Sequence, residues 1–210
     1  MKGKKGNKIK GHEETGIDWL SSLLDCLILH FFSFPDTKYA VQTRILSKRR
    51  VRLWTHLQFI YIDSKCFTNL DNLKKFIAYV VHHRYPNDIL GLSVRTHRGI
   101  LGDDLLDRIL NFVISYGGEM LDLSFGGSRN SLLLPQRIFK CQSLRVFKLS
   151  HFGNNGVPNS IGPASLRTLT LCDVTLDNKN HCFDLFSSCV NLENIVLDDV
   201  KYFIAREPDE

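Results

Sequence analysis

Cysteine, histidine and aspartate are the side chains of this chain that could bind a metal ion or transfer protons. Cys172, His181, Cys182 and Cys189 lie near one another in the sequence, and zinc prefers thiolate and imidazole ligands. Structural zinc sites usually contain ligand pairs at a short fixed spacing, and none of the six cysteines forms a Cys-x-x-Cys pair. We therefore expect free thiols, no metal site and no cofactor.

The paired histidines, aspartates and glycines do not match a known catalytic arrangement. His82-His83 lies at the end of an expected helix, where imidazole suits the helix dipole. Asp103-Asp104 suits the start of a helix, and neighbouring residues such as Asp198-Asp199 point apart on a strand. Gly117-Gly118 and Gly126-Gly127 match no phosphate-binding loop, and the second pair suits a tight turn. We expect no catalytic residue and no enzyme.

Length and composition are those of an ordinary globular protein. The chain has 210 residues, of which 43% are hydrophobic and 23% are charged, enough to bury a sizeable core. Its net charge is +5, but the first ten residues hold five lysines, so the rest is near neutral. Nucleic-acid binding by the main body requires a clustered basic face, and this charge distribution argues against one.

Two segments bear on localisation. Residues 1–16 are expected to form a disordered basic tail, with a nuclear import signal or a nucleic-acid contact as the alternative interpretation. They lack the pattern of a secretory signal. The most apolar run, residues 23–34, contains Asp25 and His30 and is shorter than the about 20 residues of a membrane span. We expect an intracellular protein of the nucleus or the cytoplasm, without a membrane segment.

Residues 17–56 are expected to form a small helical domain. From Leu20 to Phe31, apolar residues recur at the intervals of one helix face. Asp18 can begin this helix, and Pro35 ends it because proline cannot donate to the helix ladder.

Two shorter helical segments complete this domain. Thr37 can cap one that carries Ala40 and Val41, and Ser47 can cap a last turn that ends at Trp54. Three short helices cannot bury all of their apolar side chains among themselves. Part of this apolar surface should therefore contact a partner or the following domain.

An L-x-x-L-x-L spacing recurs six times in residues 57–210. Its middle positions are 32, 29, 26, 22 and 26 residues apart, around the period of leucine-rich repeats. Each unit contributes a short strand whose alternate side chains enter a shared core, so about six stacked units predict a solenoid with a parallel sheet. The six triplets are Leu57/Ile60/Ile62, Ile89/Leu92/Val94, Gly118/Leu121/Leu123, Leu144/Phe147/Leu149, Leu166/Leu169/Leu171 and Leu192/Ile195/Leu197.

The segments between these strands contain helix and loop signals. Asn69 or Thr68 can cap a helix from Leu70 to Val81, and Asp103 or Asp104 can begin one that reaches Val113. Residues 183–190 suggest a shorter helical piece, and the glycine- and asparagine-rich residues 151–164 suggest a loop.

The sequence resembles plant F-box/leucine-rich-repeat proteins, with residues 18–54 similar to the F-box and residues 57–200 to the repeats. The segment 37–54 is the most specific part, and residues 134–150 resemble the approach to a repeat strand. Three places differ from the usual family pattern: Leu24 stands for proline, Pro35-Asp36 for Leu-Pro, and Arg50 for tryptophan. The matching residues are Asp18, Ser21, Leu23, Asp25, Leu27, Ser33, Phe34, Thr37, Lys38, Ala40, Val41, Thr43, Leu46, Ser47, Lys48, Arg49, Leu53 and Trp54.

The resemblance implies a non-catalytic substrate-recognition subunit of an SCF-type (Skp-cullin-F-box) ubiquitin ligase. The F-box would dock a Skp-type adaptor, and through it a cullin, while the repeats would bind an unidentified substrate protein. The expected adaptor-binding residues are Leu20, Leu23, Leu24, Leu27, Phe31, Leu46 and Trp54. The expected substrate-binding residues, from the exposed positions of the repeat strands, are Arg145, Lys148, Arg167, Thr170, Glu193 and Val196.

Two alternatives remain open at this point. Residues 18–54 could be a helical cap on the repeats, and the protein could be a repeat scaffold that binds proteins without any link to a ubiquitin ligase. Many family members continue with more repeats and a separate C-terminal domain, so we expect a short form. In such a form the apolar face around Ile195 and Leu197 would be poorly covered.

Overall fold

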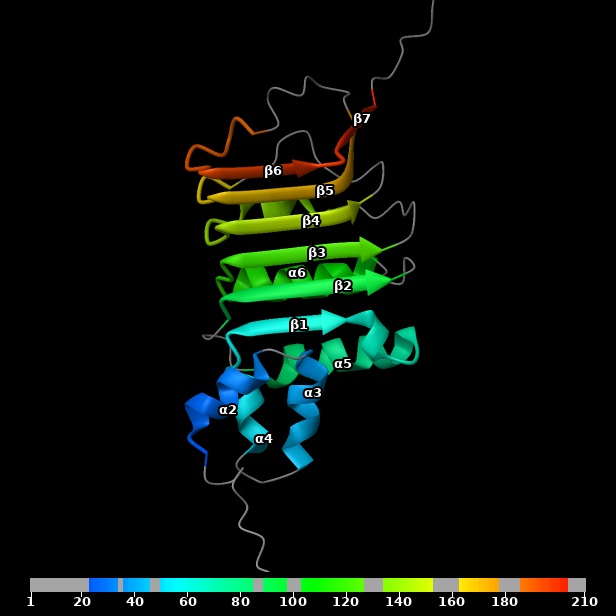
Figure 1. Ribbon diagram of the computed structural model, residues 1–210, viewed down its shortest axis with the longest axis vertical. Coiled ribbons are helices and arrows are strands. Elements are labelled where there is room, and N and C mark those ends of the chain that lie inside the picture. The colour runs from blue at the N-terminus through cyan, green and yellow to red at the C-terminus, as the bar shows by residue number, and fades with distance from the viewer. Residues whose placement is uncertain are drawn as a thin grey trace, which may run out of the picture.

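The structure is a computed structural model that describes residues 23–33, 36–45, 50–84, 89–97, 103–126, 134–152, 163–177 and 186–203. A small helical unit lies beyond one edge of a parallel sheet (Figure 1). Of the two longer helices, residues 103–115 lie behind the sheet and residues 70–83 lie at the edge next to the helical unit (Figure 1). The predicted mixed α/β fold with a parallel sheet is confirmed.

The strands follow one another across the sheet in chain order. They are β1 (Phe59–Asp63), β2 (Gly91–His97), β3 (Met120–Gly126), β4 (Val146–Phe152), β5 (Thr168–Asp177) and β6 (Asn194–Asp198), with β7 (Lys201–Phe203) beside the end of β5. Each neighbouring pair is parallel. In register, Ile60 pairs with Leu92, then Leu121, Phe147, Leu169 and Ile195 follow. The spacing of the apolar triplets therefore gives the register of the sheet.

The core lies between the sheet and the helices. In β1 to β5 the alternate apolar side chains that face the helices are buried, because residues two apart on a strand share a face. In β6 the equivalent residues Ile195 and Leu197 are 48% and 47% exposed. The expected poor cover of this last apolar face is confirmed.

Helices α5 (Leu70–His83) and α6 (Asp103–Ser115) have the predicted positions. The Asn69 side chain accepts a hydrogen bond from the backbone N–H of Asn72 at 2.9 Å, so Asn69 rather than Thr68 caps α5. His82 and His83 lie in the last turn of α5, as expected. An imidazole at the carboxyl end of a helix suits the helix dipole, and this accounts for the two histidines without a catalytic role.

The glycine pair after α6 terminates that helix. Gly117 has a φ of 68°, and the N–H groups of Gly117 and Gly118 donate to the carbonyls of Ile114 and Val113. This is the Schellman arrangement of a helix end, which requires a left-handed residue. A Cβ on Gly118 would lie 2.5 Å from Val113 Cγ1, which explains why glycine replaces the first leucine of this repeat.

The helical unit consists of α2 (Asp25–Phe32), α3 (Thr37–Gln42), α4 (Arg50–Leu53) and two short 3-10 turns, Thr43–Ile45 and Trp54–His56. The predicted long first helix is wrong within the described residues: α2 begins at Asp25, and Leu24 has an extended backbone. Asp25 in the first turn favours this start through the helix dipole. Asp18, Leu20 and Ser47 lie outside the described residues.

Asp36 caps α3, which corrects the expected cap at Thr37. One carboxylate oxygen of Asp36 accepts from the N–H of Lys38 at 2.7 Å, and the other accepts from the N–H of Asp63 at 2.5 Å. Thr37 Oγ1 instead accepts from the N–H of Tyr61 at 2.9 Å. Since Tyr61 and Asp63 belong to β1, the start of α3 attaches the helical unit to the first strand.

Two expectations in the second half of the chain are corrected. Residues 186–188 and 190–191 form turns rather than a helical piece, and Phe183 lies outside the described residues. His151 and Phe152 belong to β4 rather than to a loop, because the alternation continues to the buried Phe152. Residues 153–162 lie outside the described residues. Residues 136–140 form a 3-10 helix before β4.

A kink crosses three neighbouring strands at one register position. His151 in β4, Asp173 in β5 and Asp199 after β6 have φ values of 56°, 49° and 47°. Pairs on either side of the kink keep the same register, since Ser150 pairs with Cys172 and Phe152 with Val174. Left-handed backbone is uncommon for residues other than glycine, so a kink repeated in three strands is a property of the fold.

Candidate protein-interaction surfaces

An exposed apolar stripe runs along the helical unit. Leu24, Leu27 and Phe31 are 65%, 44% and 59% exposed. They lie three and four residues apart, so they share one side of α2 and of the residue that precedes it. Ile28, three residues before Phe31, borders this stripe and is buried, and α2 as a whole contacts α3 and α4. The structure therefore brings three of the expected adaptor-binding residues together on one surface, which we call the α2 stripe.

The remaining expected adaptor-binding residues do not join this stripe. Trp54 is 1% exposed, and its ring stacks on that of Tyr79 in α5 at 5.5 Å. Trp54 therefore packs the helical unit against α5, and its side chain is not exposed for the expected contact with an adaptor in this arrangement. Leu23 is half-buried, and Leu20 and Leu46 lie outside the described residues.

The contact between the helical unit and the sheet is polar at its centre. Burial raises the pKa of the Asp36 carboxyl, and the two backbone N–H donors described above oppose that shift. Lys38 Nζ donates to the carbonyl of Cys66 and lies 4.8 Å from the centre of the Phe67 ring. These contacts fix the helical unit on β1, so the α2 stripe is held in one orientation relative to the sheet.

Three of the expected substrate-binding residues form a row on the open face of the sheet. Lys148 in β4 pairs with Thr170 in β5, which pairs with Val196 in β6. Asp122 of β3 extends the same row. Side chains in register on a parallel sheet point the same way, so this row presents a continuous strip to a partner.

The other three expected residues line a groove at the amino-terminal ends of β4, β5 and β6. Arg145, Arg167 and Glu193 directly precede these strands, and Glu119 precedes β3. The backbone N–H of Arg145 donates to the carbonyl of Glu119, that of Arg167 to Arg145 and that of Glu193 to Arg167, at 2.8–2.9 Å. The groove has a volume of about 590 Å³. We call these four residues the charged row.

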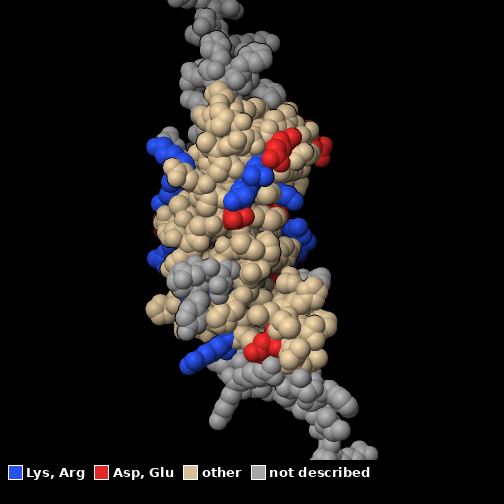
Figure 2. All heavy atoms as spheres, turned by 90° about the vertical axis from the view of Figure 1, so that its left-hand side faces the viewer, with Lys and Arg blue, Asp and Glu red and all other residues tan. Residues whose placement is uncertain are grey.

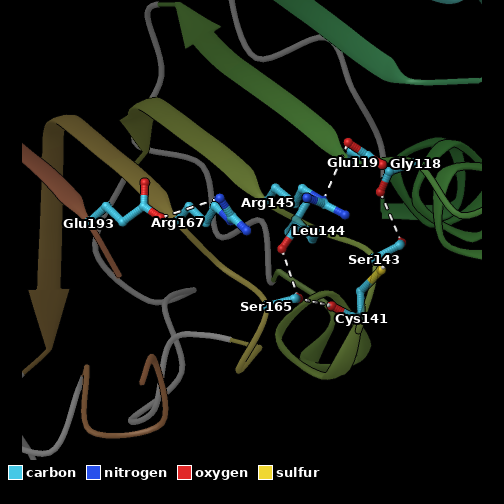
Figure 3. A network of polar contacts seen from close by, with 9 residues as sticks. All are labelled: Gly118, Glu119, Cys141, Ser143, Leu144, Arg145, Ser165, Arg167 and Glu193. Atoms are coloured by element: carbon cyan, nitrogen blue, oxygen red, sulfur yellow. Dashed lines mark hydrogen bonds and ion pairs between the residues drawn. The ribbon is translucent and has the colours of Figure 1, made fainter. Parts of the chain in front are cut away.

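The four charges of this row have a defined order, with the two bases between the two acids. Arg145 Nε lies 3.5 Å from Glu119 Oε2, and Arg167 Nη1 lies 3.4 Å from Glu193 Oε1. The two arginines are therefore neighbours in the middle, with one acid on each side (Figure 3). Figure 2 shows the strand ends of this side of the molecule, where basic and acidic side chains gather over the last strands.

Hydrogen bonds hold the turns that carry the charged row. Ser143 Oγ donates to the carbonyl of Gly118 at 3.0 Å, and Ser165 Oγ donates to that of Leu144 at 2.9 Å (Figure 3). Asn191 Nδ2 donates to the carbonyl of Ala164 at 2.7 Å. Each bond joins one turn to the turn of the preceding strand. The sequence analysis did not include Glu119 among the expected binding residues. Its place directly before β3, like that of Arg145 before β4, is the signal that could have identified it.

A second polar cluster lies at the strand kink. His151 Nδ1 lies 3.1 Å from Asp173 Oδ2, and Lys201 Nζ lies 3.6 Å from Asp173 Oδ1 and 3.4 Å from Asp199 Oδ2. The hydrogen bond with His151 lowers the pKa of Asp173, with a smaller contribution from Lys201. Asp199 raises the pKa of Lys201. These groups are about half exposed and tie the ends of β4, β5 and β7 together.

No group of three metal-binding side chains occurs in the described part of the chain. His181 and Cys182 lie outside it. Cys26, Cys66, Cys141, Cys172 and Cys189 are free thiols, as expected. No described helix is long and apolar enough to cross a membrane.

An exposed apolar stripe of this kind marks a candidate protein-interaction surface. The chain is similar to proteins of Arabidopsis thaliana: it is 30% identical over 189 residues to an F-box/LRR-repeat protein, 28% over 200 residues to an F-box/FBD/LRR-repeat protein, and 28% over 191 residues to an FBD-associated F-box protein. The predicted resemblance is confirmed, and the chain is a homologue of plant F-box/leucine-rich-repeat proteins.

These similarities extend over most of this chain but only part of each relative. The three matches cover 87%, 89% and 86% of this chain and 52%, 43% and 45% of the relatives. The chain therefore spans about half the length of the curated relatives it matches. No family model matches the chain, and no solved structure is significantly similar to it.

Proposed function

We propose that the protein is a substrate-recognition subunit of an SCF-type ubiquitin ligase. In this proposal residues 17–56 are an F-box-like domain that docks a Skp-type adaptor, and residues 57–210 are a leucine-rich-repeat domain that binds a substrate protein. Residues 1–16 form a basic tail. The names of the relatives, which contain the terms F-box and LRR-repeat, support this assignment of the two parts.

The exposure of Leu24, Leu27 and Phe31 is the observation that carries the proposal. Three large apolar side chains exposed together on one helix are a surface that a partner can cover. Tyr39 and Ile45 of the same unit are also exposed, at 50% and 82%. Burial of each residue of the α2 stripe would contribute about 1.5–3 kcal/mol before the cost of association. The α2 stripe is therefore the surface of the helical unit that we assign to the adaptor.

One departure from the usual F-box pattern has a structural role of its own. Asp36, which stands where the family has proline, caps α3 and bonds to β1. This residue therefore supports the helical unit instead of weakening it. Leu24 adds apolar surface to the stripe. The transfer of ubiquitin would occur on another subunit, so no residue of this chain acts as a catalyst in the proposal.

Co-purification with a plant Skp-type adaptor tests the proposal. We expect the intact chain to bind the adaptor and Leu27→Asp to abolish binding. Leu90→Asp is the matched control, because Leu90 has a similar exposure but lies outside the helical unit, directly before β2. Failure of the intact chain to bind any Skp-type adaptor would contradict the proposal and favour a repeat scaffold without a link to a ubiquitin ligase.

A further inference from the structure

The two edges of the sheet differ in how their backbone groups are covered. At the β1 edge, the N–H groups of Tyr61 and Asp63 donate to side-chain oxygens of Thr37 and Asp36, at 2.9 Å and 2.5 Å. At the other edge, β6 pairs only with β5 in the described part of the chain. An uncovered strand edge is a template for another strand. The outer side of β6, which we call the β6 edge, is therefore open to pairing.

The backbone groups at the β6 edge belong to Ile195 and Leu197. The N–H of Asn194 donates to the carbonyl of Arg167, on the β5 side. Along a strand, successive residues direct their N–H and C=O groups to opposite neighbours, so Val196 also faces β5 and the residues on either side of it face outward. Ile195 and Leu197 therefore offer their N–H and C=O groups to a further strand.

The side chains at the β6 edge are apolar on both faces of the sheet. Ile195 and Leu197, on the core face, are 48% and 47% exposed, and Val196, on the open face, is 49% exposed. Natural edge strands usually prevent pairing with lysine, proline or a bulge. Residues 194–198 contain neither lysine nor proline, and they pair with β5 residue by residue, without a bulge. The β6 edge therefore lacks these protections.

We propose that the β6 edge binds β6 of a second copy of this chain, antiparallel and with Val196 opposite the partner's Val196. In this register Ile195 lies opposite the partner's Leu197, and the reverse holds across the two-fold axis. The outward N–H and C=O groups of these residues then face each other, so each such pair exchanges two hydrogen bonds. The two sheets become one, and the apolar core face continues from one copy into the other.

The sequence of β6 fits a second copy in this register better than in neighbouring ones. Asn194 lies opposite the partner's Asp198, whose carboxylate accepts a hydrogen bond from the amide. Sliding the partner by two residues keeps the outward groups opposed, but it places an apolar residue of each copy opposite Glu193 or Asp199 of the other. Sliding it by one residue opposes outward and inward groups, which cannot pair. β6 is thus complementary to itself around Val196, and this favours a second copy over an unrelated strand.

Sedimentation of the intact chain at several concentrations tests this inference. The Leu27→Asp variant serves as the starting chain, so that the α2 stripe does not contribute to association. Five residues a side make a small interface, for which we expect weak association. The mass should be that of one chain, 24.1 kDa, at about 1 µM and should approach twice that value at about 500 µM. A mass of one chain at every concentration would contradict the inference, as would a mass that grows beyond two chains, because a two-fold contact closes.

A charge at the centre of the contact separates it from other modes of association. Val196→Asp would place two carboxylates about 5 Å apart across the two-fold axis, so we expect it to weaken association by at least about 10-fold. Thr168→Asp is the matched control, because Thr168 lies on the same open face one strand away, in β5, opposite Asn194. It should associate as the starting chain does. If the two variants associate equally, β6 is not the contact.

Cysteine variants test the register directly. In the proposed contact the two copies of residue 196 form a pair without backbone hydrogen bonds between them, with Cβ atoms about 4.5–5 Å apart, close to the separation in a disulfide. Val196→Cys should therefore form a covalent dimer with oxidised glutathione, beyond the level of the starting chain, in which Cys26 is exposed. Ile195→Cys should not, because its two copies lie two residues apart along the strands. A non-reducing gel that shows no dimer for Val196→Cys, or as much for Ile195→Cys, would overturn the proposed pairing.

The inference does not rest on adaptor binding. The α2 stripe lies on the helical unit, at the opposite end of the sheet from β6 (Figure 1). Val196→Asp in the otherwise unchanged chain should therefore leave binding of a Skp-type adaptor as it is, and the Leu27→Asp chain should still form dimers. Loss of dimers and loss of adaptor binding are separate results, and each contradicts one proposal only.

Discussion

His151 and Asp173 lie at the same register position of neighbouring strands, both with left-handed backbone, and their side chains meet at 3.1 Å. The contact joins two residues that are each strained alone. It also links β4 to the part of β5 that turns to pair with β7. The side-chain pair therefore stabilises the kink that crosses the last strands.

The pH dependence of this contact can be predicted. The pKa of Asp173 lies below its ordinary value, chiefly because of the hydrogen bond with His151 and also because of Lys201. The ionised carboxylate is thus favoured in the folded state. Its contribution is present above about pH 4, the ordinary range of an aspartate, and is lost as the pH falls through the lowered pKa. Since the pair is half exposed, this contribution is less than about 1 kcal/mol.

Thermal unfolding of Asp173→Asn at several pH values measures the effect. We expect a lower Tm than that of the unchanged chain at pH 6 and a difference that shrinks towards pH 3. Asparagine tolerates left-handed backbone, so the substitution tests charge more than strain. His151→Asn should remove most of the effect of Asp173→Asn when the two are combined. A difference that stays constant from pH 6 to pH 3 would show that ionisation of Asp173 plays no part.

Equivalent leucines of β5 and β6 should differ in their effect on stability. Leu171 and Leu197 are partners in register, but Leu171 is fully buried and Leu197 is 47% exposed. We expect Leu171→Ala to lower the free energy of unfolding by about 2–5 kcal/mol, and Leu197→Ala by about 1 kcal/mol or less. Urea denaturation of the two variants measures this, and equal losses would mean that another segment covers β6 in solution.

Substitutions of the two glycines after α6 should destabilise the protein for different reasons. Gly117→Ala places a side chain on left-handed backbone in open space and should cost about 1 kcal/mol, which Gly117→Asn should partly restore. Gly118→Ala places a Cβ against Val113 and should cost about 1–3 kcal/mol. Val113→Ala should relieve part of that cost in the double variant. A purely additive double variant, measured by chemical denaturation, would show that the clash is absent.

Trp54 should affect stability more than adaptor binding. Its side chain is buried against Tyr79, and no described residue accepts a hydrogen bond from its Nε1. Trp54→Ala should therefore cost about 3–5 kcal/mol, while Trp54→Phe should cost much less because only packing volume is lost. Trp54→Phe should also keep its affinity for a Skp-type adaptor. A large loss of affinity in a folded Trp54→Phe variant would restore the original expectation that this residue contacts the adaptor.

The strands were predictable because alternation of apolar residues reports burial directly. Ile60, Leu92 and Leu121 occupy the positions that the spacing predicts. These equivalent positions of the L-x-x-L-x-L pattern are also direct partners in neighbouring strands. The helices α5 and α6 were predictable for the same reason, since periodicity and a capping residue agree. The alternation within each strand and the periodicity within each helix involve residues of one short segment, which is why the sequence alone contains them.

Features that depend on a neighbouring strand were not predictable. Glu119 became part of a groove only because β3 and β4 place it beside Arg145. Trp54 lies at the end of a sequence motif, and its burial depends on Tyr79 of a later helix. The kink at His151 lies in a segment whose composition suggested a loop. In each case the deciding contact joins residues more than about 20 positions apart.

The chain order of the strands also determines how this sheet can assemble. Each strand pairs with the one that follows it, and paired residues are only 22 to 32 positions apart along the whole sheet. The entropy of closing these loops differs by only about 0.3 kcal/mol between the shortest and the longest interval. No single strand pairing therefore costs much more loop-closure entropy than the others. Folding can begin at any adjacent pair of strands and spread outward in both directions, towards the helical unit on one side and the open β6 edge on the other.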